Sequence, residues 1–187
     1  MKKKLSRKTK ETDVRIVVSR AGARCLGAVR VSTGLVFYDH MLTTLLRYAG
    51  LDAEIEAQGD LSHHVMEDVA ILLGRAIRST LTESAARFGE RTIPMDDALV
   101  QACVDVGGRF YFEGKLPNRL HTHVLRSLSE SLGATLHVRI LRGKDRHHVI
   151  EAAYKATGLA LRDAMSDTGG GVFSLKGTAV VEEETLP

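Results

Sequence analysis

The chain has 187 residues, 44% of them apolar, and a formal net charge of +3, which is enough material for a substantial core in one domain or two small ones. No uninterrupted apolar run is long enough to span a bilayer, and no apolar stretch directly follows the basic start, so we expect a cytoplasmic protein with no membrane partner. Few aromatic residues and no Trp argue against a nucleic-acid partner.

The first ten residues are basic, six of them being Lys or Arg. We expect residues 1–10 to form a basic flexible tail, either solvated or acting as an arm that meets an anion or an acidic partner. Residues 11–92 and 93–178 are expected to form two repeat units of one compact domain. Residues 179–187 are expected to form a C-terminal tail.

The first unit begins with DVRIVVSRAGARCLGAVRVSTG, which is typical of a strand, a Gly-containing turn and a second strand. A helix is predicted from His40, because HMLTTLLRYAG has apolar residues at helical spacing before Gly50. The alternating segment LDAEIEAQG predicts another strand, and SHHVMEDVAILLGRAI predicts a second helix.

The second unit repeats this order through DDALVQACVDVGGRFYFEGKL, HVLRSLSESLG, ATLHVRILRG and HHVIEA. Gly133 follows His123 by ten residues, as Gly50 follows His40, and the two HH pairs begin 23 and 24 residues after these histidines. Because chance would not place two HHxxE copies so regularly, the sequence indicates an internal duplication. Alternating strands and helices predict an α/β or α+β sandwich with helices on one face of each sheet.

The repeated residues suit metal binding. His63 and Glu67, like His147 and Glu151, are four apart on a helix and can bind one ion together. The second histidine of each HH pair points about 100° away, so it cannot easily reach that ion but can reach a second one. The candidate ligands are His40, His63, His64, Glu67, His123, His147, His148 and Glu151. This set divides into two ions with four ligands each, and imidazole and carboxylate without thiolate suit Mn, Fe, Co, Ni or Zn.

A second feature suits an anion. The C-terminal stretch DTGGGVFSLKGTAV contains three glycines followed by Ser174 and Lys176, which could cradle a phosphate with backbone N–H groups, although a flexible turn fits equally well. Arg87 and Arg109 are further candidates for a bidentate phosphate contact, although each alone also fits a surface arginine. His121 and His137 have no repeat partner and are expected to have no ligand role.

Together these motifs resemble the imidazoleglycerol-phosphate dehydratase family, lyases of histidine biosynthesis. The matching segments run in the family's order from about residue 7 to 178: RKTKET, TGLVFYDHML, GDL, HHVMED, PMDDAL, VDVGGR, RSLSESLGATLHV, GKDRHHVIEAAYKA and SLKG. The resemblance implies a duplicated ribosomal-protein-S5-domain-2-like fold, with helices packed between two mainly antiparallel sheets. It also implies two Mn²⁺ per active site, sites built between subunits, and trimers that assemble into a 24-mer.

The resemblance also implies roles for residues. The metal ligands are the same eight residues, and the substrate phosphate is bound by Arg87, Arg109, Ser174 and Lys176. Lys155 falls near the substrate, and Glu11 falls at a proposed catalytic acid/base on a mobile arm that could exclude water. The expected catalytic positions are therefore Glu11, Glu67, Glu151 and Lys155.

The implied reaction converts D-erythro-imidazoleglycerol phosphate to imidazole-acetol phosphate. Ions bound to both ring nitrogens of the substrate would favour an imidazolate, which can expel the C3 hydroxyl. A carboxylate such as Glu11 can then take the C2 proton, while the phosphate cradle supplies orientation.

The sequence departs from the family pattern at several positions. GDLSHH is about three residues short and lacks an aspartate pair before the first HH, and Thr122 replaces a usual Glu. SLKG, Ala86-Arg87 and GGR also differ from the usual forms, and losing residues that support metal ligands can cost 10- to 100-fold in metal affinity or activity. Two alternatives therefore stay open: a same-fold metalloenzyme for another azole phosphate, and a non-catalytic metal-binding assembly protein.

Overall fold

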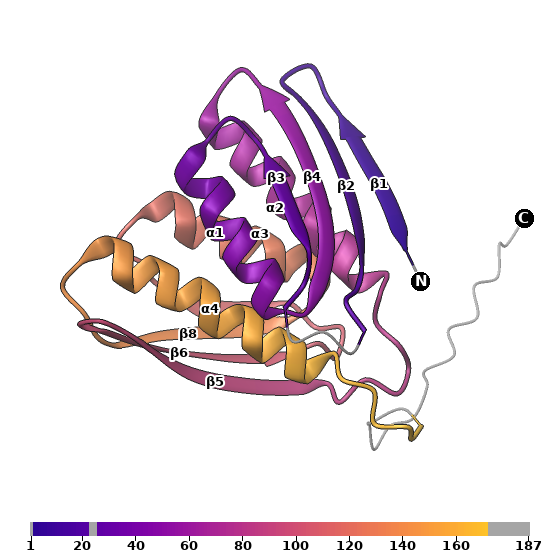
Figure 1. The fold of residues 1–187 in the computed structure, drawn as a ribbon, viewed down its shortest axis with the longest axis vertical. Helices are drawn as coiled ribbons and strands as arrows, with labels where there is room; N and C mark the ends of the chain where they lie inside the picture. Colours follow the sequence, from indigo (N-terminus) through magenta and orange to yellow (C-terminus); the bar gives the residue numbers. More distant parts are fainter. Residues whose placement is uncertain (1, 23–25, 172–187) are drawn as a thin grey trace, which may run out of the picture.

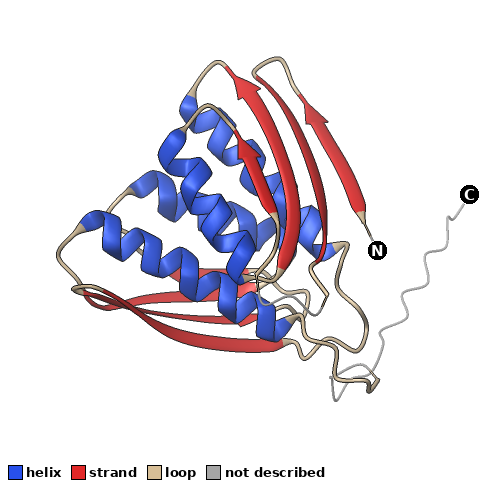
Figure 2. Cartoon of the chain, viewed as in Figure 1, coloured by secondary structure: helices blue, strands red, loops and turns tan. Residues whose placement is uncertain are grey.

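The computed structural model describes residues 2–22 and 26–171, so Ser174 and Lys176 of the expected phosphate cradle lie outside the described residues. Within the described chain, two four-stranded sheets enclose a layer of four helices (Figures 1 and 2). This architecture confirms the expected α+β sandwich with helices between the sheets.

The two halves of the chain build the two sheets. The first half contains β1 (Lys3–Lys8), β2 (Thr12–Arg20), β3 (Val29–Ser32), α1 (Val36–Tyr48), β4 (Leu51–Gly59) and α2 (Ser62–Arg78). The second contains β5 (Phe88–Met95), β6 (Ala98–Asp105), β7 (Tyr111–Gly114), α3 (Arg119–Leu132), β8 (Thr135–Arg142) and α4 (Arg146–Ala164). The strand orders β1-β2-β4-β3 and β5-β6-β8-β7 correspond one to one, which confirms the duplication.

Both sheets are mainly antiparallel, with the same exception. In the first sheet β1 pairs antiparallel with β2, and β2 with β4, whereas β3 runs parallel to β4. The second sheet repeats this pattern, with β7 parallel to β8. Alternation places Val14, Ile16 and Val18 of β2 in the core, because successive strand residues face opposite sides of the sheet.

Each unit has one more strand than the sequence pattern predicted. Residues 3–8, expected within a flexible basic tail, form edge strand β1, whose backbone pairs with β2 from Lys3 to Lys8. The equivalent strand β5 spans Phe88–Met95, so the expected division between residues 92 and 93 falls inside a strand. These strands were not predicted because an edge strand with one face in solvent lacks the long apolar pattern by which a strand is recognised.

Helices from different units pack against each other. In the helix layer α1 packs on α4 and α2 packs on α3, so each pair takes one helix from each half. Gly74 and Gly158 sit at equivalent points of these crossings. A Cβ at Gly74 would lie 2.4 Å from the carbonyl oxygen of Leu128, and one at Gly158 would lie 2.5 Å from that of Leu45. Glycine therefore allows both helix pairs to approach closely.

The helix boundaries follow from local chemistry. Gly50 and Gly133, ten residues after their leading histidines, have φ values of 67° and 72°, a left-handed conformation that favours glycine and ends the helix before it. Asp145 caps α4 by accepting hydrogen bonds from the backbone N–H groups of His147 and His148. At α2 the N-cap position is Leu61, which provides no side-chain cap.

Among the described residues, no helix is both long enough and apolar enough to cross a membrane.

Candidate metal centres

Three predicted ligands from opposite halves of the chain meet at the first candidate centre, cluster A. It consists of His40 on α1 and of His147 and Glu151 on α4. Glu151 Oε2 lies 3.3 Å from His40 Nε2 and 3.0 Å from His147 Nε2. The helical spacing of four residues brings His147 over Glu151, and the α1–α4 packing supplies His40. The three ligand atoms lie within 4.8 Å of one another, as binding to one ion requires.

Cluster B, the second candidate centre, is its counterpart between α2 and α3. It consists of His63 and Glu67 on α2 and of His123 on α3. Glu67 Oε2 lies 3.5 Å from His63 Nε2, and Glu67 Oε1 lies 3.0 Å from His123 Nε2. The two imidazole rings are stacked with centroids 5.4 Å apart, as the rings of His40 and His147 are at 6.2 Å. Each leading histidine thus joins the HHxxE of the other unit.

The donor chemistry of both clusters fits a metal ion. Each offers two imidazole nitrogens and one carboxylate, a set suited to divalent transition metals. His123 Nε2 is buried and makes no hydrogen bond within the described residues, although Glu67 Oε1 is near. Buried polar atoms normally have a partner. An ion bound to both His123 Nε2 and the Glu67 carboxylate would supply one.

Glu151 is the more buried of the two cluster carboxylates, with 9% of its side chain exposed. Burial raises its pKa, but a hydrogen bond from Lys155 and the neighbouring His40 outweigh burial, so the pKa lies below its ordinary value. Lys155 Nζ lies 2.9 Å from Glu151 Oε1, which leaves Oε2 facing the histidines. The carboxylate is therefore ionised and oriented for a cation.

The remaining predicted ligands, His64 and His148, lie in neither cluster. His64 Nδ1 is 2.8 Å from Asp60 Oδ1, and His148 Nδ1 is 2.8 Å from Asp97 Oδ1. These hydrogen bonds raise the pKa of both histidines, and the one from His148 lowers the pKa of Asp97 to about 2. Each cluster thus gathers three of the four ligands expected per ion, whereas His64 groups with Glu11 and Asp60 instead.

Glu11, the expected acid/base, lies in the turn between β1 and β2, and its Oε2 is 3.7 Å from His64 Nδ1. The turn is held to α2 by Asp68, whose carboxylate accepts hydrogen bonds from Arg7 Nε at 2.9 Å and from the Thr12 hydroxyl. The expected mobile arm is therefore seen here as a strand and turn fastened to the helix that carries Glu67.

Arg87 and Arg109 share one neighbour at a distance from the clusters. Arg87 donates to both oxygens of Asp105, at 2.8 and 3.0 Å. This hydrogen bond, with the charge of Arg109, keeps the pKa of Asp105 below its ordinary value. Arg87 lies beside the C-terminal end of α4, since its N–H bonds to the Ala164 carbonyl. His147 stands 17 residues earlier on that helix, about 25 Å away at 1.5 Å per residue.

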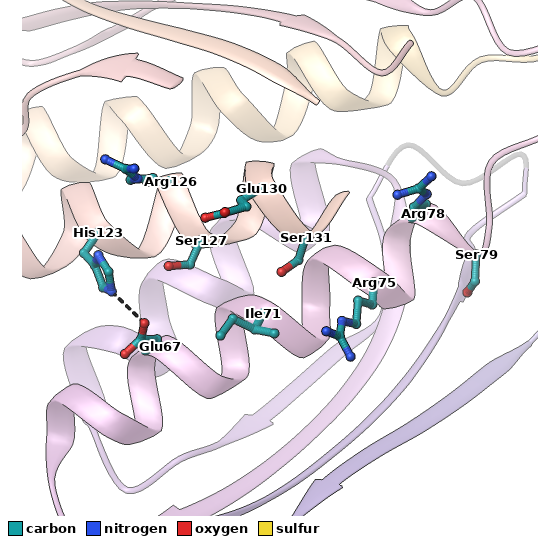
Figure 3. Close-up of a pocket in the computed structure, with 10 residues that line it drawn as sticks. All are labelled: Glu67, Ile71, Arg75, Arg78, Ser79, His123, Arg126, Ser127, Glu130 and Ser131. Carbon is teal, nitrogen blue, oxygen red and sulfur yellow. Dashed lines mark ion pairs between the residues drawn. The ribbon is translucent and has the colours of Figure 1, made fainter. Parts of the chain in front are cut away.

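A groove of about 910 Å³ leads to cluster B. It runs between α2 and α3, with Glu67 and His123 at one end and Arg75, Arg78 and Ser79 at the other (Figure 3). The groove opens cluster B to solvent along the helix pair.

Several residues around the clusters were not expected from sequence. Asp60 stands just before α2 and four residues before His64, so this spacing could have revealed it. Asp97 and Asp68 could not have been found in this way, because their partners are distant in sequence.

Thr122, noted as a departure, accepts a hydrogen bond from the Leu116 N–H and donates one to the Asn118 carbonyl, so it stabilises the start of α3. His121 is buried beside the Tyr154 hydroxyl at 3.0 Å.

Two solved structures share the fold of this chain. The crystal structure of IGPD from Pyrococcus furiosus in complex with (S)-C348 has a TM-score of 0.83 and 36% identity, covering 94% of this chain and all of that chain. Imidazoleglycerol-phosphate dehydratase from Staphylococcus aureus has a TM-score of 0.79 and 31% identity, covering 90% of this chain and all of that chain. The fold defines a hydro-lyase class, and the paired histidine–carboxylate clusters of this chain fit a metal-binding member of it.

The sequence comparisons identify the family. A family model for imidazoleglycerol-phosphate dehydratase matches residues 33–161. Relatives of that name include one from Caldivirga maquilingensis, 42% identical with coverage of 92% of this chain and 96% of the relative. Another, from Methanosarcina mazei, is 40% identical with coverage of 94% and 97%. The chain therefore belongs to the imidazoleglycerol-phosphate dehydratase family, a metalloenzyme family of histidine biosynthesis that acts on a small molecule.

Proposed function

We propose that this protein dehydrates D-erythro-imidazoleglycerol phosphate to imidazole-acetol phosphate in the cytoplasm, using two Mn²⁺ ions. The observation that carries the proposal is the pair of matching clusters, each with two histidines and one glutamate within 4.8 Å. Clusters A and B would each hold one ion. When bound, the ions would supply Lewis-acid chemistry at the two nitrogens of an imidazole ring.

The residues of the chain take complementary roles in this proposal. Glu151 and Glu67 hold cations next to paired imidazoles, and Lys155 keeps Glu151 oriented through its 2.9 Å contact. Glu11 acts as the general base that takes the C2 proton when the C3 hydroxyl leaves. Its side chain is 59% exposed and close to His64, so it is accessible to a substrate bound beside that histidine.

The distances within one chain support an active site shared between copies. Arg87, the proposed phosphate ligand with Arg109, Ser174 and Lys176, stands about 25 Å along α4 from His147. One small phosphorylated imidazole cannot reach both. His64 and His148 also lie outside clusters A and B of their own chain. We therefore extend the proposal to an assembly of trimers into a 24-mer, in which one copy completes the site of another.

Turnover of imidazoleglycerol phosphate by purified protein with added Mn²⁺, followed by the appearance of imidazole-acetol phosphate, tests the proposal. Product should form with Mn²⁺ and disappear after chelation. The Glu11→Gln variant should lower kcat by about 10²–10⁴-fold, because general acid–base catalysis supplies this much, while metal binding stays unchanged. Glu83→Gln, which alters an exposed glutamate in the loop after α2, is the matched control and should retain activity.

Two results would contradict the proposal. Protein that binds two ions per chain but forms no product would indicate another azole phosphate or a non-catalytic role. Unchanged kcat in Glu11→Gln would remove Glu11 from the chemistry. Size measurement of the wild-type protein in solution separately tests the assembly, which a monomer would refute.

A further inference from the structure

The two histidines outside the clusters make the same contact through the same atom. His64 and His148 each point Nδ1 at a carboxylate oxygen 2.8 Å away, belonging to Asp60 and Asp97 respectively. The side chains of the two histidines are 28% and 31% exposed. The same hydrogen bond at two half-buried histidines fixes both rings in the same way.

The two aspartates come from places that the duplication does not relate. Asp60 precedes α2 and meets His64 across one helical turn. Asp97 lies in the turn between β5 and β6, 51 residues before His148. The first-unit counterpart of that turn carries Glu11, which stands 3.7 Å from His64 Nδ1. The two units thus supply the carboxylate next to Nδ1 from different segments, which argues that the contact between histidine and carboxylate is itself selected.

Both carboxylates are themselves held in place. Asp97 Oδ2 accepts hydrogen bonds from the backbone N–H groups of Lys144 and Asp145, at 2.6 and 3.1 Å, which leaves Oδ1 for His148. Asp60 Oδ1 also accepts from the backbone N–H of Leu61 at 2.7 Å. These contacts orient the carboxylates before any ion binds.

A neutral imidazole that donates its Nδ1 proton to a carboxylate carries its free lone pair on Nε2. A carboxylate behind a metal-binding histidine fixes the ring and its tautomer in this way, and raises the basicity of the ligand nitrogen. At His148, Nε2 is 3.2 Å from Asp96, whose side chain is 70% exposed and free to move away for a cation.

We propose that Asp60 and Asp97 are positioning residues that fix the rings of His64 and His148 with Nε2 as the metal-binding atom. The inference rests on the proposed function, because the ion reached by each histidine belongs to the cluster of another copy. It also gives Glu11 a separate role: since Asp60 occupies Nδ1 of His64, Glu11 remains available for proton transfer.

The test is Mn²⁺ binding by the full-length, metal-stripped protein without substrate, with free Mn²⁺ counted by electron paramagnetic resonance. Asp60→Ala should weaken one of two ions by 10- to 100-fold, the usual effect of removing such a carboxylate. Asp60→Asn, which keeps an acceptor oxygen, should weaken it less. Glu83→Ala removes one exposed carboxylate elsewhere and should leave both affinities unchanged. Asp60 is 53% exposed on its side chain, so these variants should fold.

A double-mutant cycle distinguishes positioning from a general electrostatic effect. If Asp60 acts only through His64, Asp60→Ala should cause no further loss of affinity in the His64→Ala background. An equal loss in both backgrounds would overturn the inference, as would unchanged Mn²⁺ affinity in Asp60→Ala. So would a third ion per chain that disappears in Asp60→Ala, because Asp60, Glu11 and His64 would then be its ligands.

Failure of the inference is separable from failure of the proposed function. If wild-type protein binds two ions and forms product, but Asp60→Ala binds and turns over normally, only the positioning role is refuted. If wild-type protein binds no Mn²⁺, both are refuted, and the loss is visible before any variant is made.

Discussion

Gly74 lies where α2 crosses α3, and replacing it with alanine should destabilise the protein. In Gly74→Ala, the new Cβ would lie 2.4 Å from the Leu128 carbonyl oxygen and 2.8 Å from Ser131 Cβ, where ordinary contacts begin near 3.4 Å. Because the nearest obstacle is the backbone of α3, this helix has to move by about 1 Å relative to α2. Overpacking of this kind costs about 1–3 kcal/mol.

Part of that cost is offset, because alanine favours a helix over glycine by up to about 1 kcal/mol. The net loss in the free energy of unfolding should be about 1–2 kcal/mol. For a chain of this length each kcal/mol lowers Tm by about 2–4 °C, so we expect a decrease of roughly 2–8 °C. The movement should also separate His123 from Glu67, now 3.0 Å apart, and weaken the ion at cluster B.

The assay is thermal unfolding of the metal-stripped protein, followed by Mn²⁺ titration. Gly158→Ala should behave similarly at the α1–α4 crossing, but should weaken the ion at cluster A. Gly170→Ala is the matched control, because its Cβ would meet nothing nearer than 3.7 Å. An unchanged or higher Tm for Gly74→Ala would refute the claim that this glycine is required by the helix crossing.

Three further predictions concern other parts of the molecule. Burial lowers the pKa of His121 to about 4, so on acidification the unfolded state takes up this proton before the folded state does. The free energy of unfolding should therefore decrease by up to about 3 kcal/mol as pH falls from about 6.5 to 4. In urea unfolding, His121→Phe should flatten this part of the pH profile. Asp68→Ala should cost about 1–3 kcal/mol and speed proteolysis within β1, because Arg7 and Thr12 lose their acceptor; an unaltered cleavage rate by mass spectrometry would count against the fastening. His147→Ala should remove one ion and spare the other, and loss of both in a binding titration would show that the clusters are not independent.

The sequence predicted those features that depend on local spacing. The helices carrying HHxxE, the glycines ten residues after His40 and His123, and the duplicated order of elements all follow from short-range patterns. The sequence could not predict features that depend on contacts between segments distant along the chain. Strand β1, with the sequence KKLSRK, has only Leu5 as an apolar residue, so nothing in its pattern distinguishes an edge strand from a tail.

The same limit applies to the site. Spacing along one helix grouped His147 with Glu151, but only the α1–α4 contact shows that His40 joins them. The role of Asp97 also depends on a turn 51 residues away from its histidine. Sequence patterns therefore identified the donor residues, whereas tertiary packing determines how they are shared.

The exchange of leading histidines between the two halves has an evolutionary consequence. One half alone carries every type of donor found in a cluster, but its own leading histidine lies on a helix that packs against the other half. Two identical half-length chains, paired as the halves are here, would hold two identical clusters related by a twofold axis. The present protein therefore corresponds to a fused symmetric homodimer. Fusion frees each half to change separately, and Asp60 and Asp97 record such a divergence around otherwise equivalent histidines.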